Sequence, residues 1–524
     1  RSTLFPYTTL FRSPYSLCHK KRCLIRFEGG DRQNANYIDL REFDLETRAF
    51  VKDGFFLPPS VTLPVWKDSN TLLVASDFGP GTLSRRQLPI SLREWSRGAA
   101  PAKEIFRGDT SSEFGITPLQ RPNAGGDAKL LTLASPEAQS FIISANNRLV
   151  PTALPLGTTI SGAYHGEVIV QSFSNEPWKV RDATIKGGSL VSIPRKEIGS
   201  QSPTVRVIFE PGEHESIAGN GVAITRDGVL VATLKNVRGR LTRFTFDGAQ
   251  WQPHEVSIPD HGSVSLIASD PADSLVLVTY QSFLQPPTLY VVDMAAGTLK
   301  PFKKAEVLFD ASGLLTEQFE AVSKDGTRVP YFLVGPRAAG RKKSRLPTLL
   351  YGYGALGNKR TPHYDAALGR LWLERGGVFA LANIRGGSEL GPAWRVRRMD
   401  RQRTYEDFIA VAEDLIKREI TSPRHLGIRG HSNGGLLVGV VLNMRPELFS
   451  AAVIEHPVLD LWEHTRGLDS SEYGAWSDPR ERAYLESVSP LQNLTKRSPF
   501  PIPFIKTATD DYMEIGRASC RERV

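Results

Sequence analysis

Several features that would assign a function class at once are absent from this 524-residue sequence. It holds only three cysteines, which excludes a disulfide framework as its main source of stability. No apolar run reaches the length of about 18 residues that a membrane-spanning helix needs, so no transmembrane segment is expected. The HExxH zinc signature and the phosphate-binding loop are also missing. We therefore expect no metal and no cofactor.

The overall composition is that of a globular protein. Hydrophobic residues make up 40% and charged residues 23%, which excludes a disordered or fibrous chain. With 45 glycines and 36 prolines, the balance favours many turns and short strands. The net charge of +9 raises the question of a polyanionic partner, which depends on whether the basic residues belong to the protein and cluster.

The two ends of the chain are related through DNA rather than through protein sequence. Residues 3–13 (TLFPYTTLFRS) can be written in codons whose reverse complement translates as IGRASCRERV, which is residues 515–524. One DNA element in inverted orientation at both ends resembles a sequencing-library adapter. We expect residues 1–13 and 515–524 to be adapter-derived and residues 14–22 to be a junction of undefined origin.

This expectation changes the charge and the cysteine count. Without residues 3–13 and 515–524 the chain loses four arginines and one glutamate, and the net charge falls to about +6. Cys520 goes as well, leaving Cys18 and Cys23, whose CHKKRC context does not predict a metal site. The basic runs at 341–345 and 395–403 lack interleaved aromatic residues, so we expect them on the solvated surface and expect no nucleic-acid partner. The sequence leaves open whether the protein resides in the cytoplasm or in the periplasm.

Residues 23–310 read as an all-β domain. Short β-rich runs separated by turn residues predict strands, and no amphipathic helix interrupts them. Such strands are typical of a sandwich, a barrel or a propeller, and no repeat signature decides among these folds. Nearly 290 residues is too long for one sandwich and suits about six four-stranded propeller blades. The runs are 71–77, 129–135, 140–145, 167–173, 205–211, 228–234, 241–248, 274–280 and 288–294.

Residues 311–514 alternate strands with helices and predict a doubly wound α/β domain. The runs 348–354 and 377–386 are apolar strands ending in glycine, typical of a buried parallel sheet. Between 404 and 420 one helical face carries apolar side chains. They are Phe408, Val411, Ala412, Leu415, Ile416 and Ile420.

The pattern GxSxG occurs at Gly430-His431-Ser432-Asn433-Gly434, directly after a predicted strand and before a predicted helix. In this position the glycines permit a sharp turn that exposes the Ser432 hydroxyl as a nucleophile. The turn also directs the Asn433 backbone N–H toward a developing oxyanion. A glycine-rich turn without chemistry is the alternative.

A serine nucleophile needs an acid and a base, in the chain order Ser, Asp, His for this topology. Asp510 follows the strand-like run 502–509 and is the candidate acid. None of the ten histidines follows Asp510. We therefore expect the triad histidine to be absent from this chain, which would then be inactive by itself.

The stretch from about Val278 to Asp511 resembles the prolyl oligopeptidase family of serine peptidases. The matching runs are SFLQPPTLYVVD, SKDGTRVPYFLV, LLYGYGALG, ANIRGGSELGPAW, TSPRHLGIRGHSNGGLLVG, RPELFSAAV, EYG, SPLQNL and TATDD. The resemblance implies an α/β-hydrolase domain and a seven-bladed β-propeller that caps the active site and excludes folded proteins. It also implies that both domains are incomplete here.

The resemblance assigns site roles. It implies Ser432 as nucleophile, Asp510 as triad acid, an oxyanion hole formed by the Asn433 N–H and the Tyr353 hydroxyl, and Tyr473 in the specificity pocket. Two positions depart from the proline-specific pattern. Asp469 stands where those members carry a tryptophan that stacks on proline, and Tyr512 stands where they carry an arginine.

We therefore expect a monomeric serine peptidase that hydrolyses short peptides, with cleavage after proline left open. An acylaminoacyl peptidase, dipeptidyl peptidase or esterase on the same scaffold is the nearest alternative. A propeller binding module with an inactive hydrolase domain is an alternative of a different class.

Overall fold

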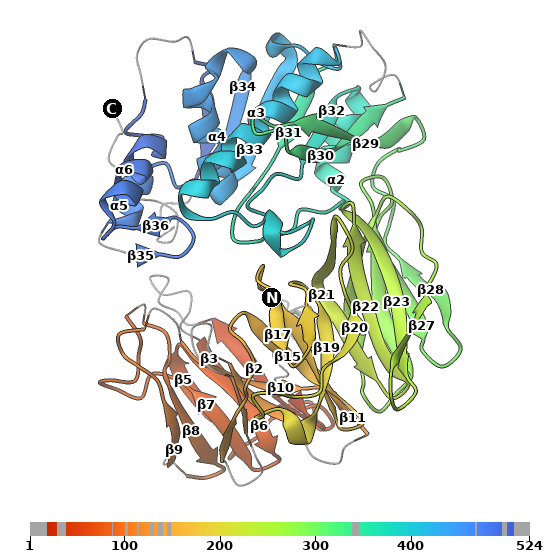
Figure 1. Cartoon of the computed structure of the whole chain (residues 1–524), viewed down its shortest axis with the longest axis vertical. Coiled ribbons are helices and arrows are strands. Elements are labelled where there is room, and N and C mark those ends of the chain that lie inside the picture. Colours follow the sequence, from red (N-terminus) through yellow and green to blue (C-terminus); the bar gives the residue numbers. More distant parts are fainter. Residues whose placement is uncertain are drawn as a thin grey trace.

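A computed structural model describes residues 18–28, 38–85, 87–99, 103–112, 115–125, 130–134, 140–143, 148–337, 345–466, 469–494 and 500–507. The segments expected to be adapter-derived, 1–13 and 515–524, lie outside these ranges, as do Asp510 and Tyr512. Figure 1 shows an all-β part below and a mixed α/β part above. No helix in the described ranges is long and apolar enough to cross a membrane.

The all-β part consists, within the described residues, of six sheets of four or five strands, which matches the number predicted from length. The first two sheets hold β1 (Cys18–His19), β2 (Arg22–Glu28), β3 (Ile38–Asp44), β4 (Ala49–Phe50) and β5 (Phe56–Ser60), then β6 (Leu63–Asp68), β7 (Thr71–Ala75), β8 (Ser91–Ser96) and β9 (Lys103–Arg107). The next two hold β10 (Thr117–Arg121), β12 (Leu130–Ala134), β13 (Phe141–Ile143) and β14 (Leu149–Pro151), then β11 (Asn123–Ala124), β15 (Thr158–Tyr164), β16 (Glu167–Ser172), β19 (Leu190–Pro194) and β20 (Arg206–Phe209). The last two hold β21 (Glu215–Thr225), β22 (Gly228–Lys235), β23 (Arg238–Phe246) and β24 (Trp251–Glu255), then β25 (Ser263–Ser269), β26 (Leu275–Gln281), β27 (Thr288–Asp293) and β28 (Thr298–Lys304). A hairpin of β17 (Trp178–Val180) and β18 (Ala183–Ile185) and a 3-10 turn at Arg195–Glu197 complete this part.

Each of the nine β-rich runs read from the sequence overlaps one of these strands. Every consecutive pair of sheets shares a buried apolar cluster, as Leu40 with Leu72 in the first pair and Val231 with Ile169 in the fourth. Alternate side chains of each strand therefore face the neighbouring sheet, which is the face-to-face packing of propeller blades.

The α/β part is built on one seven-stranded sheet. Its order is β29 (Leu314–Val322), β30 (Arg328–Pro336), β32 (Val378–Ala382), β31 (Thr348–Tyr351), β33 (Leu426–His431), β34 (Ala451–Glu455) and β37 (Pro503–Lys506). From β32 onward all neighbouring strands are parallel, while β29 and β30 pair antiparallel. The doubly wound domain predicted from alternating strands and helices is thus confirmed.

Helices cover both faces of this sheet. The helices are α2 (Ala366–Leu371), α3 (Gln402–Lys417), α4 (Asn433–Met444), α5 (Leu461–Thr465) and α6 (Pro479–Val488). Short 3-10 turns lie at Leu373–Arg375, Pro392–Trp394, Arg398–Arg401, Pro423–His425 and Pro446–Leu448, and β35 (Asp469–Ser470) pairs with β36 (Gly474–Ala475). One core joins α3 and α4 to one face, and a second joins α2 to the other face and to the propeller through Val237 and Phe283.

The predicted helix at 404–420 forms as α3, two residues earlier at its start and three shorter at its end. Phe408, Val411, Ala412 and Leu415 are buried as expected, and Ile416 is half-buried. Ile420 is buried but lies beyond the helix, because Glu419 adopts a φ of 57°, which ends the helical path. The periodicity thus identified the buried face but placed the C-terminus one turn late.

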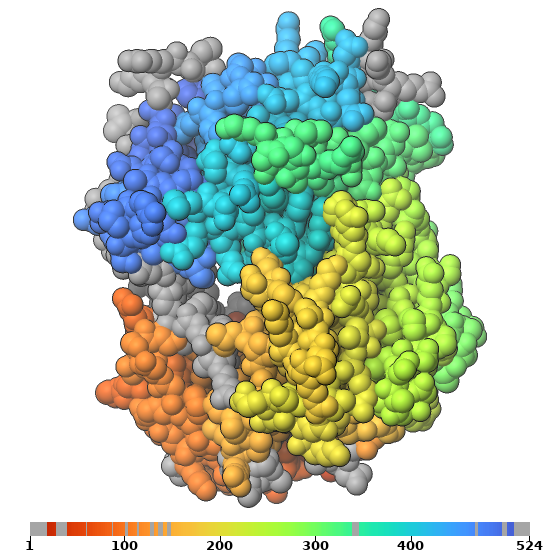
Figure 2. All heavy atoms as spheres, in the orientation of Figure 1, coloured from red at the N-terminus to blue at the C-terminus, as the bar shows by residue number. Residues whose placement is uncertain are grey.

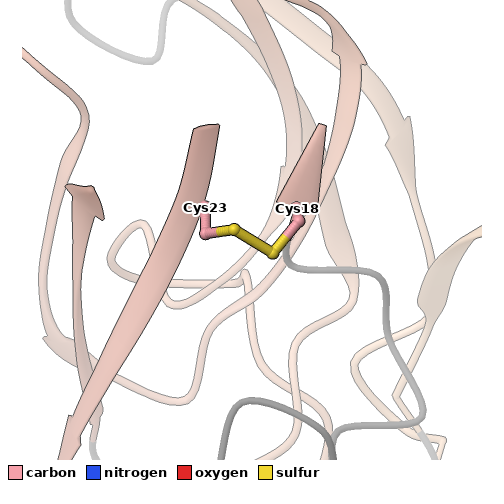
Figure 3. Close-up of a disulfide and its surroundings, with 2 residues drawn as sticks. All are labelled: Cys18 and Cys23. Carbon is pink, nitrogen blue, oxygen red and sulfur yellow. A yellow bond between two sulfur atoms is a disulfide. The ribbon is translucent and has the colours of Figure 1, made fainter. Parts of the chain in front are cut away.

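Cys18 and Cys23 form a disulfide between β1 and β2, as Figure 3 shows. Both strands also pair antiparallel, with Cys18 opposite Cys23. The sequence alone predicted neither this bond nor ordered strands within the junction residues 14–22. A single bridge closing a tight hairpin remains consistent with the absence of a disulfide framework.

The two parts meet along polar contacts, one of which is made by the backbone carbonyl of Glu389, a residue with a buried carboxyl group. Figure 2 shows the cyan segment of the α/β part resting directly on the yellow segment of the propeller. Ser216 donates to the Glu389 carbonyl oxygen at 2.8 Å, and the Lys359 ammonium donates to the Ile217 carbonyl oxygen at 2.8 Å. Glu389 is 2% exposed, and its Oε1 accepts the Arg360 N–H at 2.8 Å. Burial raises the pKa of Glu389 to about 7.

This pKa predicts a loss of stability with rising pH. Between pH 4.5 and about 7 the unfolded chain ionises Glu389 while the folded protein keeps it neutral, so the free energy of unfolding falls through this window and levels off above it. Replacing Glu389 by glutamine should remove this fall in the free energy of unfolding, which is on the order of 3 kcal/mol. The measurement is urea unfolding from pH 4 to 8. It compares the parent with Glu389→Gln and with Glu176→Gln, a control at an exposed position. Parallel curves for Glu389→Gln and the parent would show that the carboxyl is already ionised at low pH.

Candidate active site

Ser432 lies in the sharp turn between β33 and α4. Its backbone has φ 58° and ψ −122°, a conformation that costs energy for any residue with a side chain. Its N–H donates to the Glu455 carbonyl oxygen at 2.8 Å, and its own carbonyl accepts the Gly435 N–H at 2.8 Å. The end of the neighbouring strand β34 and the first turn of α4 therefore hold the strained turn, and the half-buried Ser432 side chain stands at the carboxyl edge of the sheet.

The flanking glycines are required because strand and helix cross closely. A Cβ at Gly430 would lie 1.9 Å from the Gly434 carbonyl oxygen, and a Cβ at Gly434 would lie 2.7 Å from the Gly352 carbonyl oxygen. Neither position has room for a side chain. The GxSxG spacing thus has here the geometric cause that the sequence predicted for it.

Asn433, the first residue of α4, joins the turn to two other segments. Its side-chain amide donates to the Tyr353 carbonyl oxygen at 2.8 Å, and its Oδ1 accepts from the Arg401 guanidinium at 2.9 Å and the Tyr473 hydroxyl at 3.4 Å. Ser432, Asn433, Tyr353 and Tyr473, all singled out from sequence, are therefore brought together. As a first helical residue, Asn433 carries one of the N–H groups that a helix leaves without an internal acceptor.

Tyr353 follows β31 and is 5% exposed. The Arg360 guanidinium carbon lies 4.0 Å from the centroid of the Tyr353 ring, a cation–π contact that holds the ring in place. The chain three residues after Tyr353 is fixed as well, because the Leu356 N–H donates to Glu472 Oε1 at 2.8 Å. The loop from Tyr353 to Leu356 is thus anchored at both ends.

Arg401 is the residue at this site that sequence reasoning missed. The run 395–403 was expected on the solvated surface, and that expectation is wrong for Arg401, which is 1% exposed. Its guanidinium donates to Glu472 Oε1 at 3.0 Å and lies 5.1 Å from the Tyr473 ring centroid. Arg395 of the same run donates to Glu472 Oε2 at 3.2 Å. A buried acceptor far along the chain withdraws Arg401 from water, while the Arg395 side chain stays 35% exposed. The local charge pattern carries no signal of this difference.

Tyr473 is half-buried directly before β36. Burial raises the pKa of the Tyr473 phenol to about 12, so it stays protonated and can donate throughout the neutral range. Asp469, four residues earlier, begins β35. The candidate acid Asp510 lies outside the described residues.

A cavity of about 540 Å³ opens between the two parts beside this loop. The α/β part contributes Leu356, Gly357, Asn358, Ser388 and Arg395, and the propeller contributes residues 171–173, 216–219 and 263–265. The volume suits a few amino-acid residues of a peptide.

A buried ion pair supports the loop behind the site. Arg385, 6% exposed, donates through Nε and a terminal nitrogen to Asp407 of α3 at 2.9 and 2.6 Å, and its backbone N–H donates to the same carboxylate at 3.0 Å. The other side of the guanidinium binds Asp325 at 2.5 Å. Hydrogen bonding to Arg385 holds the pKa of Asp325 well below its usual range. Helix α3 and the loop after β32 are thereby locked together.

Two family models match the chain. The model described as prolyl oligopeptidase family matches residues 363–514, and the model described as prolyl oligopeptidase, N-terminal beta-propeller domain, matches residues 135–305. The two matches fall on the two parts of the structure. They bear out both the α/β-hydrolase domain and the β-propeller expected from sequence.

Individual proteins agree with these models. An uncharacterized peptidase of Sinorhizobium fredii is 37% identical over 516 residues, covering 93% of this chain and 69% of the relative. The prolyl endopeptidase of Elizabethkingia meningoseptica is 30% identical over 263 residues, 49% of this chain and 37% of the relative. The solved structure of a post-proline cleaving enzyme from Rickettsia typhi superposes with a TM-score of 0.84 at 30% identity, covering 92% of this chain and 72% of that one.

Proposed function

Because the chain belongs to the prolyl oligopeptidase family of serine peptidases, we propose that it hydrolyses peptide bonds in short oligopeptides with Ser432 as the nucleophile. The observation that carries this proposal is the strained backbone of Ser432 between two glycines that admit no side chain. Strain of this kind persists where a turn must present a reactive group.

The oxyanion that forms when Ser432 attacks a carbonyl needs two donors. The Asn433 N–H at the start of α4 and the Tyr353 hydroxyl are our candidates. Their support is the 2.8 Å hydrogen bond from the Asn433 side chain to the Tyr353 carbonyl oxygen, which ties both residues to one local frame. Donors fixed in this way need no reorganisation as charge develops on the substrate oxygen.

We assign the triad acid to Asp510 and the general base to a histidine beyond Asp510 in the full-length protein. The base would take the proton of Ser432 and pass it to the leaving amine, while Asp510 would hold the imidazole in the correct orientation. In this proposal a polypeptide of the printed sequence alone lacks the base. The domains would span residues 23–310 for the propeller and 311–514 for the hydrolase part.

The interdomain cavity supports short peptides as substrates. A folded protein cannot enter a space of about 540 Å³ between two packed domains, whereas an extended peptide of a few residues can. In this proposal the propeller limits the size of the substrates that enter the cavity beside Leu356.

Cleavage after proline is our candidate for the residue preference of this peptidase activity. The similarity to the post-proline cleaving enzyme of Rickettsia typhi favours it. Asp469 opposes it, since a carboxylate cannot stack on a proline ring as the tryptophan expected at that position would. Tyr473 would line the pocket under either specificity.

A panel of chromogenic substrates tests the proposal on the full-length protein. We expect turnover of an N-blocked tripeptide p-nitroanilide, with the rates for Pro, Ala, Phe and Arg at the residue before the scissile bond ranking the preference. Exclusive hydrolysis of an acetyl-amino-acid anilide, of an unblocked dipeptidyl anilide or of a p-nitrophenyl ester would instead assign the acylaminoacyl, dipeptidyl or esterase alternative. Absence of turnover on every substrate would favour a propeller binding module.

A further inference from the structure

We propose that Arg401 is a positioning residue that holds the oxyanion donors in register, an inference that rests on the proposed function. It acts through Asn433 and Glu472, which both contact the loop from Tyr353 to Leu356. We call Arg401, Asn433 and Glu472 the clamp.

The clamp grips the loop from Tyr353 to Leu356 at both ends. Asn433 donates to the Tyr353 carbonyl oxygen at 2.8 Å, and Glu472 accepts the Leu356 N–H at 2.8 Å. Arg401 bridges these two gripping residues, one guanidinium nitrogen to Glu472 Oε1 at 3.0 Å and the other to Asn433 Oδ1 at 2.9 Å. The result is a closed ring of hydrogen bonds around the base of the loop.

A planar cation with two separate donor nitrogens fits this ring. Asn433 Oδ1 and Glu472 Oε1 are both acceptors, and a guanidinium meets them with two nitrogens held in one plane. All three clamp side chains are buried, Arg401 at 1%, Asn433 at 2% and Glu472 at 4% exposure. In such an environment each hydrogen bond is strong and the geometry is tightly fixed.

The clamp also contacts Tyr473, the residue that the proposed function assigns to the specificity pocket. Arg401 lies 5.1 Å from the centroid of the Tyr473 ring, and the Tyr473 hydroxyl donates to the same Asn433 Oδ1 at 3.4 Å. If substrate binds against Tyr473 as the proposed function has it, the bound substrate is connected through one acceptor atom to the residue that supplies the backbone oxyanion donor.

The test compares Arg401→Met and Arg401→Lys in the full-length protein with Arg403→Met as the matched control. Arg403 lies two residues away and pairs with Asp400 at the surface. We expect Arg401→Met to lower kcat by about 10- to 100-fold and Arg401→Lys by about 10-fold, with KM within about threefold of the parent, because misplaced donors weaken only the transition state. Arg403→Met should keep the parental kcat. Arg401→Lys keeps the buried charge, so it provides the measurement if Arg401→Met does not fold.

A double-mutant cycle with Tyr353→Phe separates positioning from general destabilisation. If Arg401 acts through the oxyanion donors, its replacement should lower kcat by a smaller factor when the Tyr353 hydroxyl is already gone. Equal losses in both backgrounds, or a kcat of Arg401→Lys equal to the parent, would overturn the positioning role. Failure of the proposed function gives a different result, since the parent itself would then resist labelling of Ser432 by a fluorophosphonate.

Discussion

Replacing Ser432 by alanine should lower kcat of the full-length protein by about 10⁴- to 10⁶-fold, the loss typical of removing the nucleophile of a serine-dependent triad. The residual rate would come from the oxyanion donors and from binding alone. A fluorophosphonate probe should label the parent at Ser432 and leave Ser432→Ala unlabelled. Turnover of the blocked anilide and mass spectrometry of the labelled peptide measure the two effects.

Ser450→Ala is the matched control for this experiment. Ser450 is an exposed serine of the same domain whose hydroxyl donates to the Leu426 carbonyl oxygen at the edge of the sheet. It should keep both labelling and turnover. A parent that resists the probe, or a label on another serine, would contradict the assignment of the nucleophile. Hydrolysis by the printed 524-residue polypeptide that is lost in Ser432→Ala would contradict our placement of the base beyond Asp510.

Replacing Asp407 by alanine should reduce the free energy of unfolding by about 3 to 5 kcal/mol, because it leaves a buried guanidinium with half of its partners. Asp407 is fully buried and accepts four hydrogen bonds, three from Arg385 and one from the Ser323 hydroxyl at 2.6 Å. Asp325 remains on the other side of Arg385, but it is 38% exposed and cannot replace the lost acceptor. Urea unfolding at neutral pH measures the change.

Glu406→Gln is the control, one residue away on the same helix. Glu406 pairs with Lys324, whose side chain is 79% exposed, so its replacement should cost less than about 1 kcal/mol. If Asp407→Ala also reduced the free energy of unfolding by less than about 1 kcal/mol, water or another acceptor would have to reach Arg385. The contrast separates the effect of a buried ion pair from that of a surface pair.

The local pattern of the sequence was sufficient for the elements that depend on neighbours in the chain. Strand lengths and turn residues predicted the propeller strands, and the 3.6-residue periodicity predicted the buried face of α3. GxSxG placed Ser432 correctly at the strand-to-helix turn, because the constraint acts between residues only four apart, Gly430 and Gly434. Where the end of α3 was misplaced, the apolar pattern continued one turn past the helix, and tertiary packing buried Ile420 in a non-helical path.

Only the tertiary structure determined which of the charged residues are buried. Arg401 lies in a basic run typical of a solvated surface, yet its partners Asn433 and Glu472 stand 32 and 71 residues away. Glu389 likewise has a buried carboxyl group, and the backbone N–H that binds it belongs to Arg360, 29 residues away. Burial of a charge depends on which distant acceptor the fold brings to it, and sequence spacing carries no record of that distance. The sequence alone therefore determined the sharp turn at Ser432 and the two-part scaffold, and the fold determined the clamp beside that turn.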